Sequence, residues 1–258
     1  MIKLEHVVLA SPEQMEFIIE GCRNPLNSWA RSDSKVEPET IGDFGEEYGS
    51  LFELGENDHS LMQRLANAGT DHRKFMRMMP VYVRITAPLY WWKEFDTYKV
   101  GTVANSCSTM HKIQEKKFTL EDFSTEHLYY SDRDMDEYIN DNDRKERWAC
   151  GHPMYLMNIM VGTLNYYREK YLECESVLKS KELVNREEIK KNQKDLWWQM
   201  IQLLPSSYNQ TRNVMLNYEV LCNIYRSRKD HKLDEWKEFC KWIEELPCSE
   251  LIVGKEED

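Results

Sequence analysis

The stretch PVYVRITAP, residues 80–88, decides the class of fold that the sequence predicts. Val81, Val83 and Ile85 alternate with other residues, and a period of two places all three on one face of a β-strand. Residues 2–9, IKLEHVVL, alternate in the same way before they become fully apolar, and they predict a second strand. We therefore expect a sheet with at least one buried face.

Helical patterns surround these strands. Ser11 is suited to cap a helix that runs to about Arg23, because its hydroxyl can accept a backbone N–H and Gln14 can return the bond. The residues expected to face inward from this helix are Phe17, Ile18 and Cys22. Apolar spacing predicts further helices over residues 60–69, 90–95 and 153–180. With 10 Gly and 8 Pro among 258 residues, the chain favours a helix-rich fold over a barrel of short strands.

The last third of the chain is also expected to be helical. Apolar residues recur with helical spacing over residues 214–225 and again over 233–243, so both stripes should pack into the core. On one continuous helix, Asn217 and Arg228 would be eleven residues apart, or about three turns, and would lie near one line. We expect this polar flank to point into a hollow.

Three segments lack a clear period. Residues 24–57 and 110–150 are predicted to be long inserted loops, and residues 181–195 a polar linker. The aspartates at 132, 134, 136, 141 and 143 could hold calcium, but the glycine and final glutamate of an EF-hand loop are missing, so a solvated loop is the better interpretation. The predicted fold class is α+β: one domain, residues 1–258, in which a central mixed or antiparallel sheet packs against several long helices.

Composition excludes several classes of function. Lys plus Arg total 34 against 45 Asp plus Glu, so the net charge of −11 does not attract a nucleic-acid polymer or an anionic membrane. No apolar run reaches the roughly 18 residues of a membrane span, and the N-terminus lacks a signal-peptide pattern, so we expect a cytoplasmic protein. The seven cysteines show no CxxC pair, which predicts reduced thiols and no metal site.

The order of these features resembles a known family. Arg23 closes the first helix, Gly69 ends the second, and the clearest strand leads into Ala87-Pro88. After Leu204-Pro205, the pattern NxRxxxNxxxxR falls on Asn217, Glu219, Asn223 and Arg228. The chain resembles the flavin-dependent thymidylate synthases (ThyX) in this order, and the resemblance implies a ThyX-like fold over most of the chain.

The family's signature, RHRxxSxNxxSxR, is nearly erased here. Counted from Ala87-Pro88, it falls on residues 97–109, where Lys99 keeps one positive charge. Thr102 and Cys107 stand at the two serine positions, and Thr97 and Thr109 replace arginines. A threonine cannot supply the bidentate guanidinium that binds phosphate, which argues against ordinary synthase chemistry.

The resemblance nevertheless implies a set of ligand-binding positions. For a nucleotide or cofactor these are Lys93, Glu94, Tyr98, Lys99, Thr102, Asn105, Asn217, Asn223, Arg228 and His231, with a flavin-side role for His72. The aromatic residues Tyr90, Trp91, Trp92 and Tyr98 could stack on a base, although packing in the core is the plainer interpretation for the Trp pair. The implied ligands are FAD and dUMP, and the implied assembly is a homotetramer with sites between subunits.

Cys107 is the one candidate catalytic residue. On a helix it would lie at i, i+4 from His111, which could activate the thiol, but a plain buried thiol is the better interpretation of Cys107.

Three functions follow. The first is a ThyX-like protein that binds a nucleotide or flavin-type ligand after the synthase chemistry was lost or altered. The second is a divergent but active FAD-dependent enzyme that methylates dUMP with methylenetetrahydrofolate and NADPH, using Lys93, Lys99 and Arg228 for phosphate. The third is an assembly or partner-binding protein without a small ligand.

Overall fold

The computed structural model describes residues 2–41, 46–128, 152–180 and 185–254. Its contacts divide the chain into two compact units. The sheet unit comprises Ile2–Thr86, Glu94–Asn105 and Thr211–Asp258, and the hairpin unit comprises Ala87–Lys93 and Ser106–Gln210. The single domain expected from the sequence remains a prediction.

A four-stranded sheet forms most of the sheet unit's framework. Its order is β1-β4-β6-β5, and β1 runs antiparallel to β4 with Lys3 opposite Thr86. The strands are β1 (Lys3–Leu9), β4 (Pro80–Pro88), β5 (Val103–Ser106) and β6 (Asn209–Asn217). The two strands predicted from alternation are confirmed. The prediction of helix over residues 214–217 is wrong, because these residues end β6.

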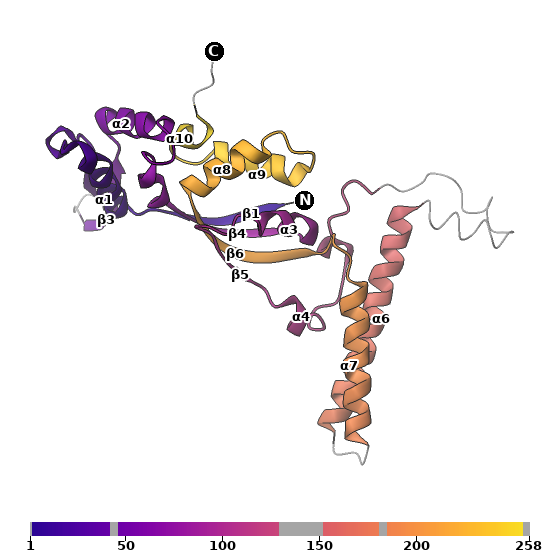
Figure 1. Ribbon diagram of the computed structural model, residues 1–258. Helices are drawn as coiled ribbons and strands as arrows, with labels where there is room; N and C mark the ends of the chain where they lie inside the picture. The colour runs from indigo at the N-terminus through magenta and orange to yellow at the C-terminus, as the bar shows by residue number, and fades with distance from the viewer. Residues whose placement is uncertain (1, 42–45, 129–151, 181–184, 255–258) are drawn as a thin grey trace. The chain divides into compact units, whose positions relative to one another are not determined.

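One face of this sheet is buried and the other is open. Val81, Val83 and Ile85 are at most 2% exposed, as are Val214 and Leu216 of β6. Helices α8 (Tyr218–Arg228) and α9 (Asp234–Glu244) lie over this face (Figure 1). The alternating residues on the opposite face, such as Tyr82 at 46% exposure, carry no such cover among the described residues. The second predicted apolar stripe is confirmed in α9, whose Trp236 and Ile243 are fully buried.

Helix α1 (Pro12–Arg23) begins as its sequence predicts. The Ser11 hydroxyl accepts the N–H of Gln14 at 3.3 Å, and the Gln14 side chain accepts the N–H of Ser11 at 2.9 Å. The expected inward position of Phe17 is wrong, since this side chain is 62% exposed. The buried arc is centred on Ile18, Ile19 and Cys22, and Phe17 lies beside it.

Residues 24–57 are not a long loop. The segment contains two short 3₁₀ helices, an antiparallel hairpin of two strands, and the first two residues of α2. These elements are η1 (Asn24–Leu26), η2 (Trp29–Arg31), β2 (Lys35–Ile41), β3 (Glu46–Glu53) and α2 (Glu56–Asn67). Buried Asp58 holds the segment together, because one of its oxygens accepts the hydroxyls of Ser32 and Ser34 and the other accepts the Nε–H of Arg23 at 2.7 Å.

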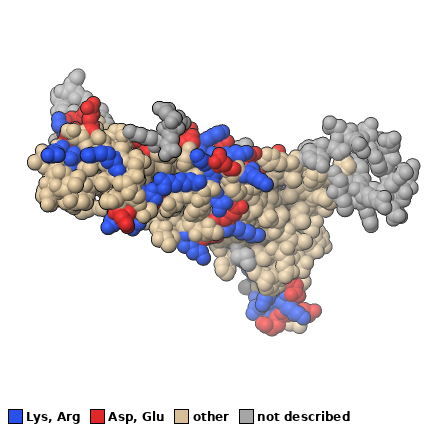
Figure 2. All heavy atoms as spheres, turned by 45° about the horizontal axis from the view of Figure 1, so that its top comes forward, with Lys and Arg blue, Asp and Glu red and all other residues tan. Residues whose placement is uncertain are grey.

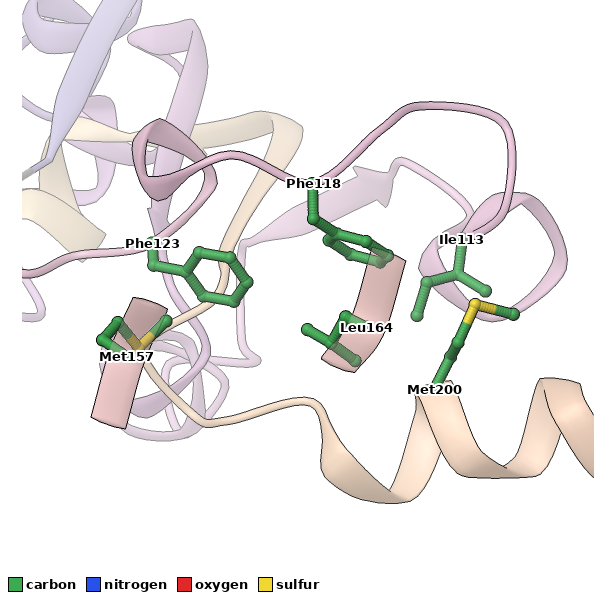
Figure 3. Packing of buried hydrophobic residues seen from close by; sticks show 6 residues of the cluster. All are labelled: Ile113, Phe118, Phe123, Met157, Leu164 and Met200. Carbon is green, nitrogen blue, oxygen red and sulfur yellow. The ribbon is translucent and has the colours of Figure 1, made fainter. Parts of the chain in front are cut away.

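The hairpin unit is built on two long helices, α6 (Pro153–Lys179) and α7 (Arg186–Leu203), which pack against each other. The predicted helix 153–180 is confirmed, whereas the predicted linker 181–195 is mostly the first half of α7. Figure 3 shows a buried cluster of this unit, with side chains from α6, from α7 and from residues 113–123. Its members are Ile113, Phe118, Phe123, Met157, Leu164 and Met200.

Several shorter elements complete the description. The predicted helix 90–95 is confirmed as α3 (Leu89–Phe95), and η3 (Lys74–Arg77) follows Gly69, whose φ of +102° suits the end of α2. The expected loop 110–150 contains α4 (Thr109–Lys112) and η4 (Leu120–Asp122), and its aspartate cluster lies outside the described residues. The C-terminal α10 (Glu250–Val253) packs on α8 and α2. Every helix in the described ranges is too short or too polar to cross a membrane.

Candidate functional site

Four polar and aromatic side chains gather around Glu94 in the sheet unit. Glu94 Oε2 accepts hydrogen bonds from Arg228 Nη1 at 2.7 Å and from Trp236 Nε1 at 2.9 Å. His231 Nε2 lies 3.4 Å from the same oxygen. The Arg228 Nε–H is donated to the Tyr98 hydroxyl at 2.9 Å. We call Glu94, Tyr98, Arg228, His231 and Trp236 the Glu94 cluster.

This cluster neutralises the guanidinium that the resemblance assigns to phosphate. The Arg228 guanidinium carbon lies 4.9 Å from the Trp236 ring centre and 5.7 Å from that of Tyr98, so two aromatic faces add cation–π attraction to the ion pair. The Arg228 side chain is 20% exposed and that of Glu94 35%. The expected polar flank therefore packs on the protein's own atoms at this end, not into a hollow.

The second acid singled out by the sequence is paired as well. Arg73 Nε lies 2.7 Å from Glu219 Oε2, and both side chains are almost fully buried. Arg73 Nη1 also donates to Cys222 Sγ at 3.1 Å, while burial raises the pKa of that thiol. Arg73 was not singled out from the sequence, because its partner lies 146 positions later and no local pattern connects them. The neighbouring His72 is exposed.

Asn217 and Arg228 stand at the two ends of α8. Asn217 is the N-cap of α8, and its Oδ1 accepts the N–H of Val220 at 3.0 Å. Its amide nitrogen also faces the backbone of Gly101, where an added Cβ would lie 3.1 Å away. Asn223 is exposed on α8. The predicted continuous helix is confirmed from Tyr218 to Arg228, but Asn217 precedes it with an extended backbone, and the three polar positions have separate surroundings.

The residues at and just before the erased signature include two exposed lysines and a buried hydroxyl. Lys93 and Lys99 are exposed, and neither forms an ion pair with another described residue. The Thr102 hydroxyl is buried without a hydrogen-bond partner in the described part of the chain. Trp91 and Trp92 are at most 1% exposed, which confirms them as core residues.

Asn105 lines a hollow of about 470 Å³ on the open face of the sheet. We call it the sheet-face hollow. Tyr82 offers a partly exposed ring, and Arg84 stands opposite Glu5 of β1 but forms no ion pair with a described residue. The lining residues come from all four strands: His6, Val8, Tyr82, Val83, Arg84, Val103, Asn105, Asn213, Val214 and Met215.

Cys107 lies in the hairpin unit, just before α4, so the helical spacing proposed for Cys107 and His111 is wrong. The thiol is exposed, not buried. Gln210 fixes this stretch from β6, because its amide donates to the Thr109 hydroxyl at 2.9 Å and to the Cys107 carbonyl oxygen at 3.4 Å. Whether Cys107 acts as a nucleophile stays a prediction.

Comparison with known proteins identifies the fold. No family model matches the sequence, and no curated protein matches it. Among solved structures, a thymidylate synthase X (ThyX) from Helicobacter pylori with FAD and dUMP has a TM-score of 0.53 at 16% identity, covering 98% of this chain and 95% of that one. A second ThyX structure from the same organism, also with FAD and dUMP, has a TM-score of 0.52 at 15% identity, covering 98% and 96%. A UMP/dUMP methylase, PolB from Streptomyces cacaoi, has a TM-score of 0.49 at 12% identity, covering 96% and 93%. The likeness to the two ThyX structures shows that the chain has a ThyX-like α+β fold.

Proposed function

We propose that this chain is a ThyX-like nucleotide-binding protein in which the thymidylate synthase chemistry has been lost. The fold likeness to chains crystallised with FAD and dUMP supports a nucleotide-type ligand. The ion pair between Glu94 and Arg228 carries the second half of the proposal, because it neutralises the cation that the family resemblance assigns to this helix.

A phosphate at Arg228 would compete with Glu94 for the guanidinium. Each charge-assisted hydrogen bond contributes about 1.5–3 kcal/mol, and the guanidinium already makes one to Glu94 and a further bond to Tyr98. The Glu94 carboxylate would in addition repel the incoming phosphate. Thr97 and Thr109, at two arginine positions of the signature, restore no charge. Phosphate binding in the inherited manner is thus disfavoured at each of these positions.

Two positions that the resemblance assigns to a nucleotide or cofactor are already engaged within the protein. Asn217 uses its side-chain oxygen to cap α8, and the charge of Arg228 is neutralised in the Glu94 cluster. We therefore assign no catalytic step to FAD.

The sheet-face hollow supplies chemistry that suits a nucleotide. Arg84 provides a guanidinium, Tyr82 an aromatic ring, and Asn105 and Asn213 amides that can read the edge of a base. A volume of about 470 Å³ lies within the roughly 300–1,000 Å³ of small-molecule sites. These groups support a mononucleotide as the ligand class. Because of the family resemblance, we also propose that the protein forms a homotetramer.

Calorimetry with dUMP, UMP and FAD tests the proposal directly. We expect binding of a pyrimidine mononucleotide, and Arg84→Gln should weaken it about tenfold, the effect of about 1.4 kcal/mol. Arg64→Gln, at an exposed arginine of α2 outside the hollow, is the matched control and should leave affinity unchanged.

Two further outcomes separate the alternatives. NADPH-dependent tritium release from labelled dUMP would overturn the loss of chemistry and establish the active-synthase alternative. Absence of binding to every nucleotide tested would overturn the nucleotide-binding function and favour an assembly protein. Light scattering tests self-association against a monomer of 30.9 kDa.

A further inference from the structure

A second hollow, of about 360 Å³, lies within the hairpin unit and contains three lysines. We call it the lysine pocket. Its position beside α4 and the following segment brings Lys112, Lys116 and Lys117 together, although the chain as a whole is acidic. The lining is completed by Cys107, Ser108, Thr109, Ile113, Phe118, Asp122 and Tyr208.

The lysines are only partly neutralised. Lys112 pairs with Glu115, and Lys116 Nζ lies 2.7 Å from Asp122 Oδ1. Lys117 forms no ion pair with another described residue. Three cations thus face two carboxylates, which leaves the pocket with a net positive charge. Figure 2 shows acidic and basic side chains next to one another over the visible face. The lysine pocket, by contrast, has more basic than acidic groups.

The segment that carries these lysines is fixed to α6. Asn165 Oδ1 accepts the N–H of Phe118 and Asn165 Nδ2 donates to the Phe118 carbonyl, both at 2.9 Å. Arg168 donates to the carbonyl oxygens of Gln114 at 2.8 Å and Glu115 at 3.2 Å. Ile113 and Phe118 anchor the same segment in the buried cluster of Figure 3. The pocket is therefore preorganised, which lowers the entropy lost when a ligand binds.

Neutral donors complement the lysines. Burial raises the pKa of Tyr208, so its hydroxyl keeps its proton and can donate a hydrogen bond. Ser108 and Thr109 add hydroxyl groups. Asp122 is the one acid in the lining, and its Oδ2 already accepts the N–H of Thr119 at 2.8 Å. The set of ammonium and hydroxyl donors matches the oxygens of a phosphate group.

We propose that the lysine pocket is a binding site for the phosphate group of a small anionic ligand, with Lys117 as its main cation. This site is separate from the sheet-face hollow and does not depend on the proposed nucleotide function. The exposed thiol of Cys107 lies in the lining, so a bound anion should shield it from reagents.

Inorganic phosphate is the probe, and alkylation of Cys107 by iodoacetamide, mapped by mass spectrometry, is the local readout. Phosphate should slow this reaction in a saturable way, whereas sodium chloride at the same ionic strength should not. Cys174 is buried in the same unit and should stay unmodified as an internal measure of folding.

Lys117→Gln should raise the phosphate concentration needed for half-protection about fivefold, the effect of one partly screened charge contact. Lys191→Gln, at an exposed lysine of α7, is the matched control and should change nothing. Equal protection in both variants, or no saturable protection in the parent protein, would overturn the proposal. Nucleotide binding that depends on Arg84 but not on Lys117 would leave the proposed function standing while the pocket fails, so the two results are distinguishable.

Discussion

Replacing Glu94 by glutamine tests whether the Glu94 cluster stabilises the fold and suppresses phosphate binding. The substitution keeps the shape of the side chain and one oxygen for Trp236 Nε1, but it removes the charge that faces Arg228. Hydrogen bonds to charged groups contribute about 1.5–3 kcal/mol, and exposure of 20% and 35% screens part of this. We expect Glu94→Gln to lower the free energy of unfolding by about 1–2 kcal/mol.

Urea unfolding of the variants in a double-mutant cycle measures the interaction energy between Glu94 and Arg228. Arg228→Met keeps an apolar stem against Trp236 and removes the charge, and the cycle with Glu94→Gln should give a coupling energy of about 1 kcal/mol. Asp234 and Lys237 form an exposed i, i+3 pair on α9 and serve as the control, with an expected coupling of about 0.3 kcal/mol. Coupling at Glu94 no larger than in this control would refute a stabilising role for the ion pair.

The same variants have a functional consequence. Glu94→Gln releases the Arg228 guanidinium from its carboxylate, so affinity for dUMP at α8, outside the sheet-face hollow and independent of Arg84, should rise about tenfold, the effect of one charge-assisted bond of about 1.4 kcal/mol. The double variant with Arg228→Met should lose this gain. If Glu94→Gln binds dUMP no better than the parent, then Glu94 does not suppress phosphate binding, and that part of the proposed function is wrong.

Three further predictions concern the framework of the sheet unit. Burial would raise the pKa of Asp58, but its hydrogen bonds hold it at about 2 against about 3.8 unfolded, so its carboxylate stabilises the fold above about pH 4. About 2 kcal/mol of that stability should be lost as the pH falls from 4 to 2, which urea unfolding at each pH would detect and which Asp58→Asn should not show. Asn217→Ala should cost about 1 kcal/mol in urea unfolding through the lost N-cap, and Asn217→Asp should retain most of it. Gly101→Ala should lower the melting temperature, because φ is +78° and the new Cβ would meet Val220 at 3.1 Å.

Local patterns predicted β1, β4 and most helices, but they failed where two elements share one apolar run. The helical spacing over residues 214–225 joins the end of β6 to α8. Val214 and Leu216 also alternate, and both are buried because they follow the period of a strand. Asn217, a residue suited to capping, marks the junction in the sequence. The sequence thus indicates where the strand ends, but the helical spacing extends across this junction and led to the prediction of one longer helix.

In charged segments, regular structure was missed. Residues 186–195 contain many Glu, Lys and Gln, which made them resemble a linker, yet these residues have good helix propensity. The apolar groups that fix this helix on α6 come later, at Trp197, Met200 and Ile201. The hairpin of β2 and β3 was missed because Pro38 and several glutamates weaken its strand pattern.

Both acidic substitutions in the family pattern have an arginine partner from a distant part of the chain. Glu94 pairs with Arg228, and Glu219 pairs with Arg73 in the core. Removing only the acid would leave a poorly solvated guanidinium, and removing only the arginine would leave a poorly solvated carboxylate, so each pair is retained or lost as a unit. Such pairs cannot be inferred from spacing, since only the fold joins residues 134 and 146 positions apart. A phosphate that binds this protein must therefore be held by cations outside these pairs, and Arg84 and Lys117 are described residues that meet this condition.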